Sequence, residues 1–183
     1  MKAIVPALPV AFALVSSVAL AALKPGEAAP DFTVQAAQGG KDFSFSLKEA
    51  LKKGPVVLYF YPKSFTKVCT IEAHEFAEAM EQFAAMGASV IGVSADKLET
   101  QREFSSKECR DKFPVGADPD FKVINAYDAA FNVPVAGAMF ASRISYVISP
   151  EGKILSSVAD SGATKHIENA LAVVKQWRDA QKK

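Results

Sequence analysis

The sequence has few of the residues from which metal sites and disulfide-rich scaffolds are built, with two cysteines and two histidines among 183 residues. Cys69 and Cys109 do not form a Cys-x-x-Cys pair, and their spacing with His74 and His166 matches no zinc pattern. A metal-binding module built on these four side chains is therefore disfavoured. A single structural disulfide between the two cysteines remains open.

The sequence also lacks a surplus of charge of either sign, since 21 basic and 20 acidic residues give a formal net charge of +1. No basic excess favours nucleic acid as a partner, and no charge block indicates a disordered tail. Hydrophobic residues make up 50% of the chain and charged residues 22%. This composition is typical of one globular domain with a substantial core.

One long apolar run stands at the very start of the chain. A short basic start precedes residues 3–20, and small residues follow that suit a signal peptidase. Residues 1–22 are therefore predicted to be a cleavable signal peptide, with a retained membrane anchor as the alternative. Pro6 and Pro9 interrupt the run and favour cleavage. The mature domain, residues 23–183, is then expected to be periplasmic or secreted, with no membrane segment left.

The strongest local signal surrounds Cys69. Residues 55–61 are apolar, aromatic or β-branched and predict a buried strand, which Pro62 ends. A helical pattern follows, with inward positions spaced by three and four: Cys69, Ala73, Phe76, Met80 and Phe83. Cys69 is thus predicted in the first turn of a helix, facing the protein. Unpaired N–H groups and the helix dipole stabilise a thiolate there.

Pro62-x-x-x-Thr66-x-x-Cys69 matches all three fixed positions of a known active-site motif. Here the sequence resembles the peroxiredoxins, of the alkyl hydroperoxide reductase/thiol-specific antioxidant family. Tyr-Pro-Lys around Pro62 and Cys-Thr-x-Glu-Ala from Cys69 are similar to its bacterioferritin-comigratory branch. The resemblance extends from Pro25 through the last helix. It implies a peroxidase that reduces hydrogen peroxide or organic hydroperoxides without a cofactor and is recycled through a disulfide by a thioredoxin-like donor.

The resemblance also assigns roles within the motif. Cys69 would be the peroxidatic cysteine, whose thiolate attacks the peroxide. The Thr66 hydroxyl would cap the helix and hydrogen-bond the peroxide, or would only cap the helix. Pro62 would shape the pocket and shield the thiolate from water, although alone it could merely end the strand.

Arg143 opens a later strand and is similar to the second active-site arginine of the family. Its fixed charge would stabilise the thiolate and polarise the peroxide, whereas an arginine at a strand edge is ordinarily just solvated. Glu72, one turn after Cys69, is expected to orient Arg143. The alternative for Glu72 is simply a favourable anion in the first helical turn.

The chain departs from the branch at the resolving cysteine. Many members carry it five residues after the peroxidatic one, where this sequence has His74. A second subgroup keeps it on a later helix, at a position that aligns with Ser105, and Cys109 lies one turn further on. Cys109 is therefore predicted to resolve the Cys69 sulfenic acid. A structural disulfide and a one-cysteine enzyme, in which Cys109 is incidental or pairs between chains, are the alternatives.

Strands alternating with helices and a late hairpin predict an α/β sandwich with a central mixed sheet flanked by helices, in agreement with the thioredoxin fold that the resemblance implies. Residues 131–142, rich in Ala, Val and Gly, are expected to form a loop. Strands are expected at 33–36, 42–45, 55–61, 89–94, 143–149 and 153–159, an extended piece at 113–115, and helices within 46–54, 69–87, 98–109, up to Tyr127, and 167–177.

An exported thiol–disulfide oxidoreductase of thioredoxin fold is the main functional alternative. Such proteins need Cys-x-x-Cys, and Thr66 occupies the place of its first cysteine. The preferred peroxide and the physiological donor stay open, as does the choice between a monomer and a homodimer.

Overall fold

The computed structural model describes residues 22–133 and 137–182. Of the predicted signal peptide, residues 1–21 lie outside the described residues. Within the two described ranges, no helix is both long enough and apolar enough to cross a membrane.

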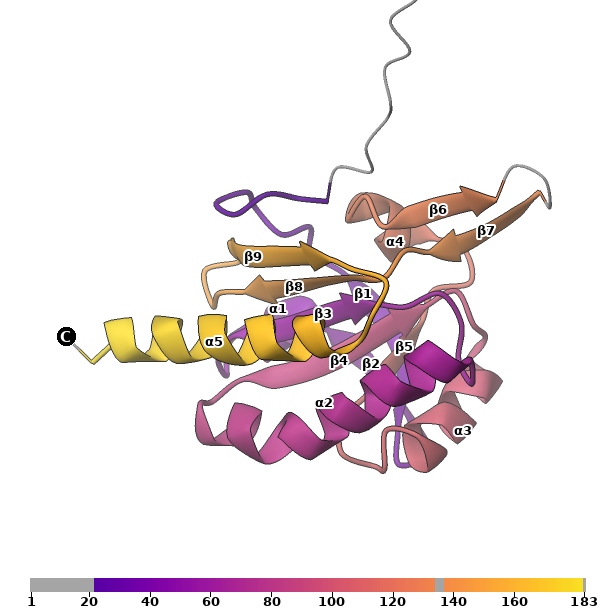
Figure 1. Ribbon diagram of the computed structural model, residues 1–183, viewed down its shortest axis with the longest axis horizontal. Helices are drawn as coiled ribbons and strands as arrows, with labels where there is room; N and C mark the ends of the chain where they lie inside the picture. Colours follow the sequence, from indigo (N-terminus) through magenta and orange to yellow (C-terminus); the bar gives the residue numbers. More distant parts are fainter. Residues whose placement is uncertain (1–21, 134–136, 183) are drawn as a thin grey trace, which may run out of the picture.

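A mixed sheet of seven strands forms the centre of the molecule, in the order β2-β1-β5-β4-β3-β8-β9 (Figure 1). Strands β5, β4 and β3 run parallel, and the outer neighbours pair antiparallel. The mixed sheet confirms the predicted α/β architecture. The strands are β1 Thr33–Gln38, β2 Lys41–Ser46, β3 Val56–Phe60, β4 Ser89–Ser94, β5 Val115–Ala117, β8 Ile144–Ile148 and β9 Ile154–Ala159.

Helices cover both faces of this sheet. Because successive strand residues point to opposite faces, Leu58 and Tyr146 pack on the side of α1 and α4, whereas Val57 and Val147 pack on the side of α2 and α5. The helices are α1 Leu47–Leu51, α2 Lys67–Ala85, α3 Leu98–Lys107, α4 Lys122–Ala126 and α5 Thr164–Ala180. The first begins as predicted, with the Ser46 hydroxyl accepting from the Glu49 N–H.

Strand β3 connects the core to the helix that carries Cys69. All five of its residues are buried, because it lies between β4 and β8 in the middle of the sheet. The chain leaves its carboxyl end at Tyr61 and enters α2 at Lys67. The first turn of α2 therefore lies at the carboxyl edge of the parallel strands, where open α/β sheets bind their ligands.

The prediction for residues 131–142 is wrong. The described residues of this range are not a loop: β6 (Ala130–Val133) and β7 (Ala138–Ala141) pair antiparallel, and Gly137, directly before β7, takes a positive φ of 59°. The helix expected within 98–109 is confirmed and ends at Lys107, and the left-handed backbone of Arg110 and Asp111 prevents it from continuing beyond the following turn. Cys109 consequently lies in the turn that follows α3.

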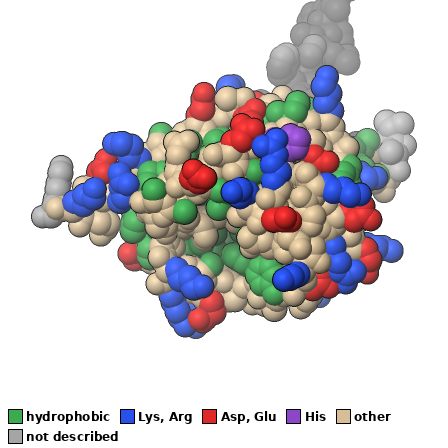
Figure 2. Space-filling view, turned by 90° about the horizontal axis from the view of Figure 1, so that it is seen from below, with side chains coloured by type: hydrophobic (Ala, Val, Ile, Leu, Met, Phe, Trp, Pro, Cys, Tyr) green, Lys and Arg blue, Asp and Glu red, His purple; other side chains and the backbone are tan. Residues whose placement is uncertain are grey.

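The surface carries charges of both signs. Figure 2 views the molecule from below, on the side of α2, α3 and α5, and shows basic and acidic side chains interspersed over that face. This distribution agrees with the formal net charge of +1.

Candidate active site

Cys69 is the third residue of α2 and only 1% exposed. The helix begins after Thr66, so Cys69 stands in the first turn and faces the sheet, as predicted. The unpaired N–H groups of the first turn and the helix dipole give this end of α2 a partial positive charge.

The loop that leads into α2 is fixed from below by a buried polar network. The Ser64 N–H donates to Asp96 Oδ2 at 2.8 Å, and the Tyr61 hydroxyl donates to Gln101 Oε1 at 2.7 Å. Phe65 holds a φ of 64°, which is uncommon for a bulky side chain. The network supports this unfavourable backbone conformation and sets the direction in which α2 starts.

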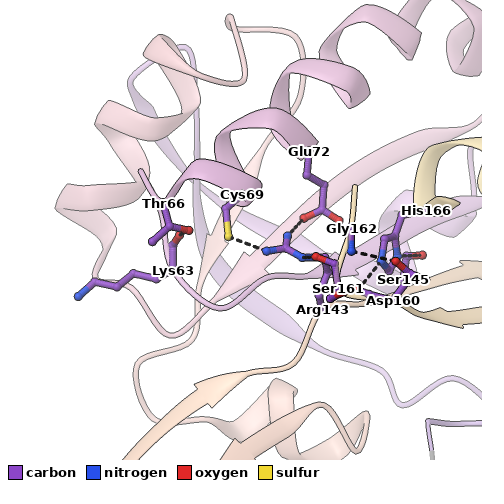
Figure 3. Close-up of polar contacts among 10 residues, drawn as sticks. All are labelled: Lys63, Thr66, Cys69, Glu72, Arg143, Ser145, Asp160, Ser161, Gly162 and His166. Carbon is purple, nitrogen blue, oxygen red and sulfur yellow. Dashed lines mark hydrogen bonds and ion pairs between the residues drawn. The ribbon is translucent and has the colours of Figure 1, made fainter. Parts of the chain in front are cut away.

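Arg143 reaches Cys69 from the neighbouring strand. It immediately precedes β8 and shares its face of the sheet with α2 and α5. Its Nη2 donates to the Sγ of Cys69 at 3.2 Å, its Nη1 donates to Oε2 of Glu72, and its Nε donates to the carbonyl of Ser161 at 3.2 Å (Figure 3). The guanidinium is thus held on three sides, with 9% of the side chain exposed.

The charges of this cluster are strongly coupled. Glu72 is fully buried, and burial raises the pKa of its carboxyl to about 8, an effect that Arg143 only partly offsets. Burial alone would lower the pKa of Arg143, but Glu72 and Cys69 together raise it above its ordinary value. Arg143 therefore stays charged beside the sulfur, where a cation favours the thiolate over the thiol.

Thr66 occupies the N-cap position, but its side chain does not cap the helix. Its Oγ1 donates instead to the carbonyl of Lys63 at 2.9 Å. The predicted capping hydrogen bond is thus wrong, because the hydroxyl turns back toward the preceding loop. Thr66 itself is exposed at the start of α2.

A shallow hollow of about 430 Å³ opens in front of Arg143. Its lining comes from the loop before α2, the β6–β7 hairpin, the two residues before β8, and the end of β9 with the loop that follows it. These residues are Pro62, Phe131, Ala141, Ser142, Arg143, Ala159, Asp160 and Ser161. Pro62 forms part of its wall, whereas Cys69 and Thr66 do not line it, and Arg143 connects the hollow to the buried sulfur.

Cys109 is a free thiol without surface exposure. It belongs to the same hydrophobic cluster as Cys69, together with aromatic side chains that include Tyr59, Tyr61 and Phe104. Burial raises the pKa of the Cys109 thiol well above its ordinary value, and the acidic neighbours Glu108 and Asp111 add to this effect. In this conformation Cys109 is a neutral thiol and a poor nucleophile.

Comparison with known proteins assigns the chain to a family. Residues 25–157 match the AhpC/TSA family. The chain belongs to it. A putative peroxiredoxin bcp of Helicobacter pylori strain J99 is 33% identical over 151 residues, covering 81% of this chain and 96% of the relative. Peroxiredoxin Bcp of Bacillus subtilis is 31% identical over 157 residues, covering 84% and 96%.

The solved structures agree with the sequence relatives. Peroxidoxin BcpB from Mycobacterium tuberculosis superposes with a TM-score of 0.76 at 28% identity, covering 84% of this chain and 97% of the other. The fold is therefore the thioredoxin fold of the peroxiredoxins, and the protein is a bacterioferritin-comigratory-type peroxiredoxin. Its activity is that of a thiol-dependent peroxidase, with a peroxide as substrate. The alternative of a thiol–disulfide oxidoreductase gains no support.

Both histidines of this peroxiredoxin have protein partners. His74 Nε2 lies 2.8 Å from Glu108 Oε2, and His166 contacts the Ser145 hydroxyl and the Asp160 carbonyl. Across residues 22–133 and 137–182, no three of the side chains His, Cys, Asp and Glu gather as a metal would require.

The sequence did not predict the residues that hold Arg143 at its Nε side, away from Cys69 and Glu72. Ser161 contributes only its backbone carbonyl, so side-chain patterns carry no signal for it. His166 has no expected role once the metal site is disfavoured, yet its side chain is completely buried. The available signal was its place in the first turn of the last helix, directly after the polar turn of residues 160–162.

Proposed function

We propose that Cys69 is the nucleophile of this peroxidase and that Arg143 holds it as a thiolate. The observation that carries the proposal is the single guanidinium that contacts both the Cys69 sulfur and the Glu72 carboxyl. Glu72 occupies Nη1 and thereby aims Nη2 at the sulfur. This arrangement supports the predicted orienting role of Glu72 more than the simple role of a helix-start anion.

The reaction begins when the thiolate attacks the terminal oxygen of the peroxide. A sulfur–oxygen bond forms and the oxygen–oxygen bond breaks, so sulfur is oxidised by two electrons and becomes a sulfenic acid. The leaving oxygen departs as an alkoxide or hydroxide and takes up a proton to become an alcohol or water. Arg143 stabilises the negative charge as it moves from sulfur to the leaving oxygen.

Thr66 and Pro62 shape the approach to the sulfur. The Thr66 hydroxyl donates a hydrogen bond to the carbonyl of Lys63, so its oxygen is free to accept a hydrogen bond from the peroxide. Pro62 has no backbone N–H and presents an apolar wall beside Arg143. Pro62 thereby limits the access of water to the thiolate.

Cys109 resolves the sulfenic acid in this proposal. Its thiol sulfur attacks the Cys69 sulfur, a disulfide forms, and water leaves with the Cys109 proton. Because Cys109 is buried and neutral, the turn after α3 and the first turn of α2 must open before the sulfurs meet. The positive φ values of Arg110 and Asp111 mark that turn as a short irregular segment suited to such a change.

Mass analysis without reductant tests the disulfide. After one equivalent of peroxide, the account expects an intramolecular Cys69–Cys109 bond that a thioredoxin-like donor reopens. Cys109→Ser should stop at the sulfenic acid of Cys69. Wild-type turnover by Cys109→Ser with a dithiol protein donor would assign a one-cysteine mechanism. A disulfide present before peroxide is added would show a structural bridge.

The remaining proposals concern the setting of the enzyme. The reductant is a thioredoxin-like dithiol protein, and the enzyme works outside the cytoplasm as a monomer or homodimer after loss of residues 1–22. Leu23 packs against the core, and its N–H lies 3.4 Å from the Tyr146 hydroxyl, so a mature chain that begins there keeps these contacts and loses only the packing of Ala22. The mass of the protein from its native compartment tests this, since a full-length mass would favour a retained anchor.

A further inference from the structure

His166 is completely buried, and both of its ring nitrogens have partners (Figure 3). Nδ1 lies 2.8 Å from the Ser145 hydroxyl, and Nε2 lies 3.1 Å from the carbonyl oxygen of Asp160. A carbonyl can only accept, so Nε2 carries the proton and donates to Asp160. In the neutral ring Nδ1 then accepts from the Ser145 hydroxyl.

The surroundings of His166 favour this neutral form. The residue stands in the first turn of α5, where the helix dipole disfavours a cation. The charged groups around it are Arg143, Asp160 and Lys165. Burial lowers the pKa of His166, and the positive charge of Arg143 acts in the same direction.

The two partners of His166 both connect to Arg143. Ser145 follows Arg143 by two residues and lies on the same face of the sheet. Asp160 precedes Ser161, whose carbonyl accepts from Arg143 Nε at 3.2 Å. His166 and Arg143 therefore bind two successive carbonyls of the β9–α5 connection. The side chain of Asp160 braces the same turn, accepting from the Gly162 N–H at 2.8 Å.

We infer that His166 is a positioning residue for Arg143, acting through the backbone of Asp160 and Ser161. The imidazole holds the β9–α5 connection in place, and the Ser161 carbonyl in turn holds the guanidinium at Nε. Glu72 fixes the opposite side of the group, so the direction of Nη2 toward Cys69 depends on both supports. The inference rests on the role proposed above for Arg143.

Two substitutions separate the bond to Asp160 from the bond to Ser145. His166→Asn keeps an acceptor near Nδ1 but does not reach Asp160, and His166→Gln places an amide N–H near Nε2. Peroxide reduction by the reduced protein should slow by roughly 10- to 100-fold in His166→Asn, the scale of a small misplacement of a reacting group. His166→Gln should retain more of the rate. Equal loss in both variants would count against the inference.

The matched control is Val174→Ala, which removes buried volume from the same helix away from the site. It should lower the melting temperature and leave the rate unchanged. The ultraviolet absorbance of the Cys69 thiolate, measured in a Cys109→Ser background, should fall at neutral pH in His166→Asn and stay constant in Val174→Ala.

Combination with Arg143→Ala distinguishes the inference from the function on which it rests. If His166 acts through Arg143, His166→Asn causes no further slowing in an Arg143→Ala background. A wild-type rate in His166→Asn, or the same fractional loss in both backgrounds, would overturn the inference. A wild-type rate in Arg143→Ala alone would instead refute the proposed role of Arg143.

Nitrogen NMR of the wild-type protein supplies a test without any substitution. The proton should reside on Nε2 of His166 at neutral pH. A proton on Nδ1, or a charged ring, would contradict the hydrogen bonds from which the inference starts.

Discussion

Arg143 Nη2 lies 3.2 Å from the sulfur of Cys69, although the two residues are 74 positions apart in the sequence. The register of the sheet brings them together. Strands β3 and β8 are antiparallel neighbours in which Phe60 pairs with Ile144. The exit from β3 toward Cys69 therefore lies beside the entry into β8, where Arg143 stands.

Replacing Arg143 with alanine tests this contact. Arg143→Ala should slow peroxide reduction by roughly 100- to 1,000-fold, the scale of losing one preorganised electrostatic partner in a buried site. Stopped-flow peroxide reduction measures the effect, and thermal unfolding should remain cooperative. Arg102→Ala is the matched control, because Arg102 pairs with Asp42 at 2.6 Å on the surface. Equal rates in the two variants would remove Arg143 from the mechanism.

The Thr66 hydroxyl has two predicted roles, capping α2 and hydrogen-bonding the peroxide, and substitution of Thr66 separates them. Because its side chain makes no capping bond, Thr66→Val should change the free energy of unfolding by less than about 0.5 kcal/mol. Peroxide reduction should slow by about 10-fold, the scale of one hydrogen bond, and Thr66→Ser should keep the rate. A loss of about 1 kcal/mol of stability with an unchanged rate would assign the hydroxyl to capping alone.

Glu72 should make stability depend on pH. Its pKa is about 8 in the folded protein against an ordinary value of 4.5, so between these values the folded state binds a proton that the unfolded state has lost. Stability therefore falls as pH rises through this window. Denaturant unfolding should show that the wild type loses stability relative to Glu72→Gln as pH rises, because the amide introduced by this substitution does not titrate. If the free energy of unfolding of the wild type instead rises relative to that of Glu72→Gln over this pH range, the carboxylate is stabilising.

His74 connects α2 to the turn that holds Cys109, through its 2.8 Å contact with Glu108. Removing this contact lowers the free energy needed to open the turn. His74→Ala should therefore speed formation of the Cys69–Cys109 disulfide by up to about 5-fold, the scale of one hydrogen bond. The peroxide step should not change.

Lys107→Ala serves as the control for His74, since the ion pair of Lys107 with Glu103 lies within α3. Its disulfide should form at the wild-type rate. A slower disulfide in His74→Ala would mean that the contact organises the resolving conformation instead of restraining it.

The sequence predicted the sheet, the long helices and the burial of Cys69 because hydrophobic periodicity carries these features directly. Arg143 could be assigned to the site only through the family resemblance, since a lone arginine before a strand has no local signal. Glu72 followed from its helical spacing to Cys69. The prediction of these residues therefore rests on a short-range pattern or on a motif shared with the family.

The features that sequence reasoning missed depend on tertiary contacts. The hairpin of β6 and β7 has weak alternation, and its small residues were mistaken for a loop. The direction of the Thr66 hydroxyl is decided by the nearby Lys63 carbonyl, an interaction that competes with capping. His166 acquires its partners only when α5 packs on the sheet, so a one-dimensional pattern cannot reveal them.

The rate of peroxide consumption by Cys69→Ser, compared with that of Cys109→Ser, tests the central claim most directly. Each reduced protein is mixed with peroxide in a single turnover. The account predicts no consumption by Cys69→Ser above the protein-free rate, and one equivalent consumed by Cys109→Ser at the wild-type rate. Peroxide consumption by Cys69→Ser at the wild-type rate would contradict the account.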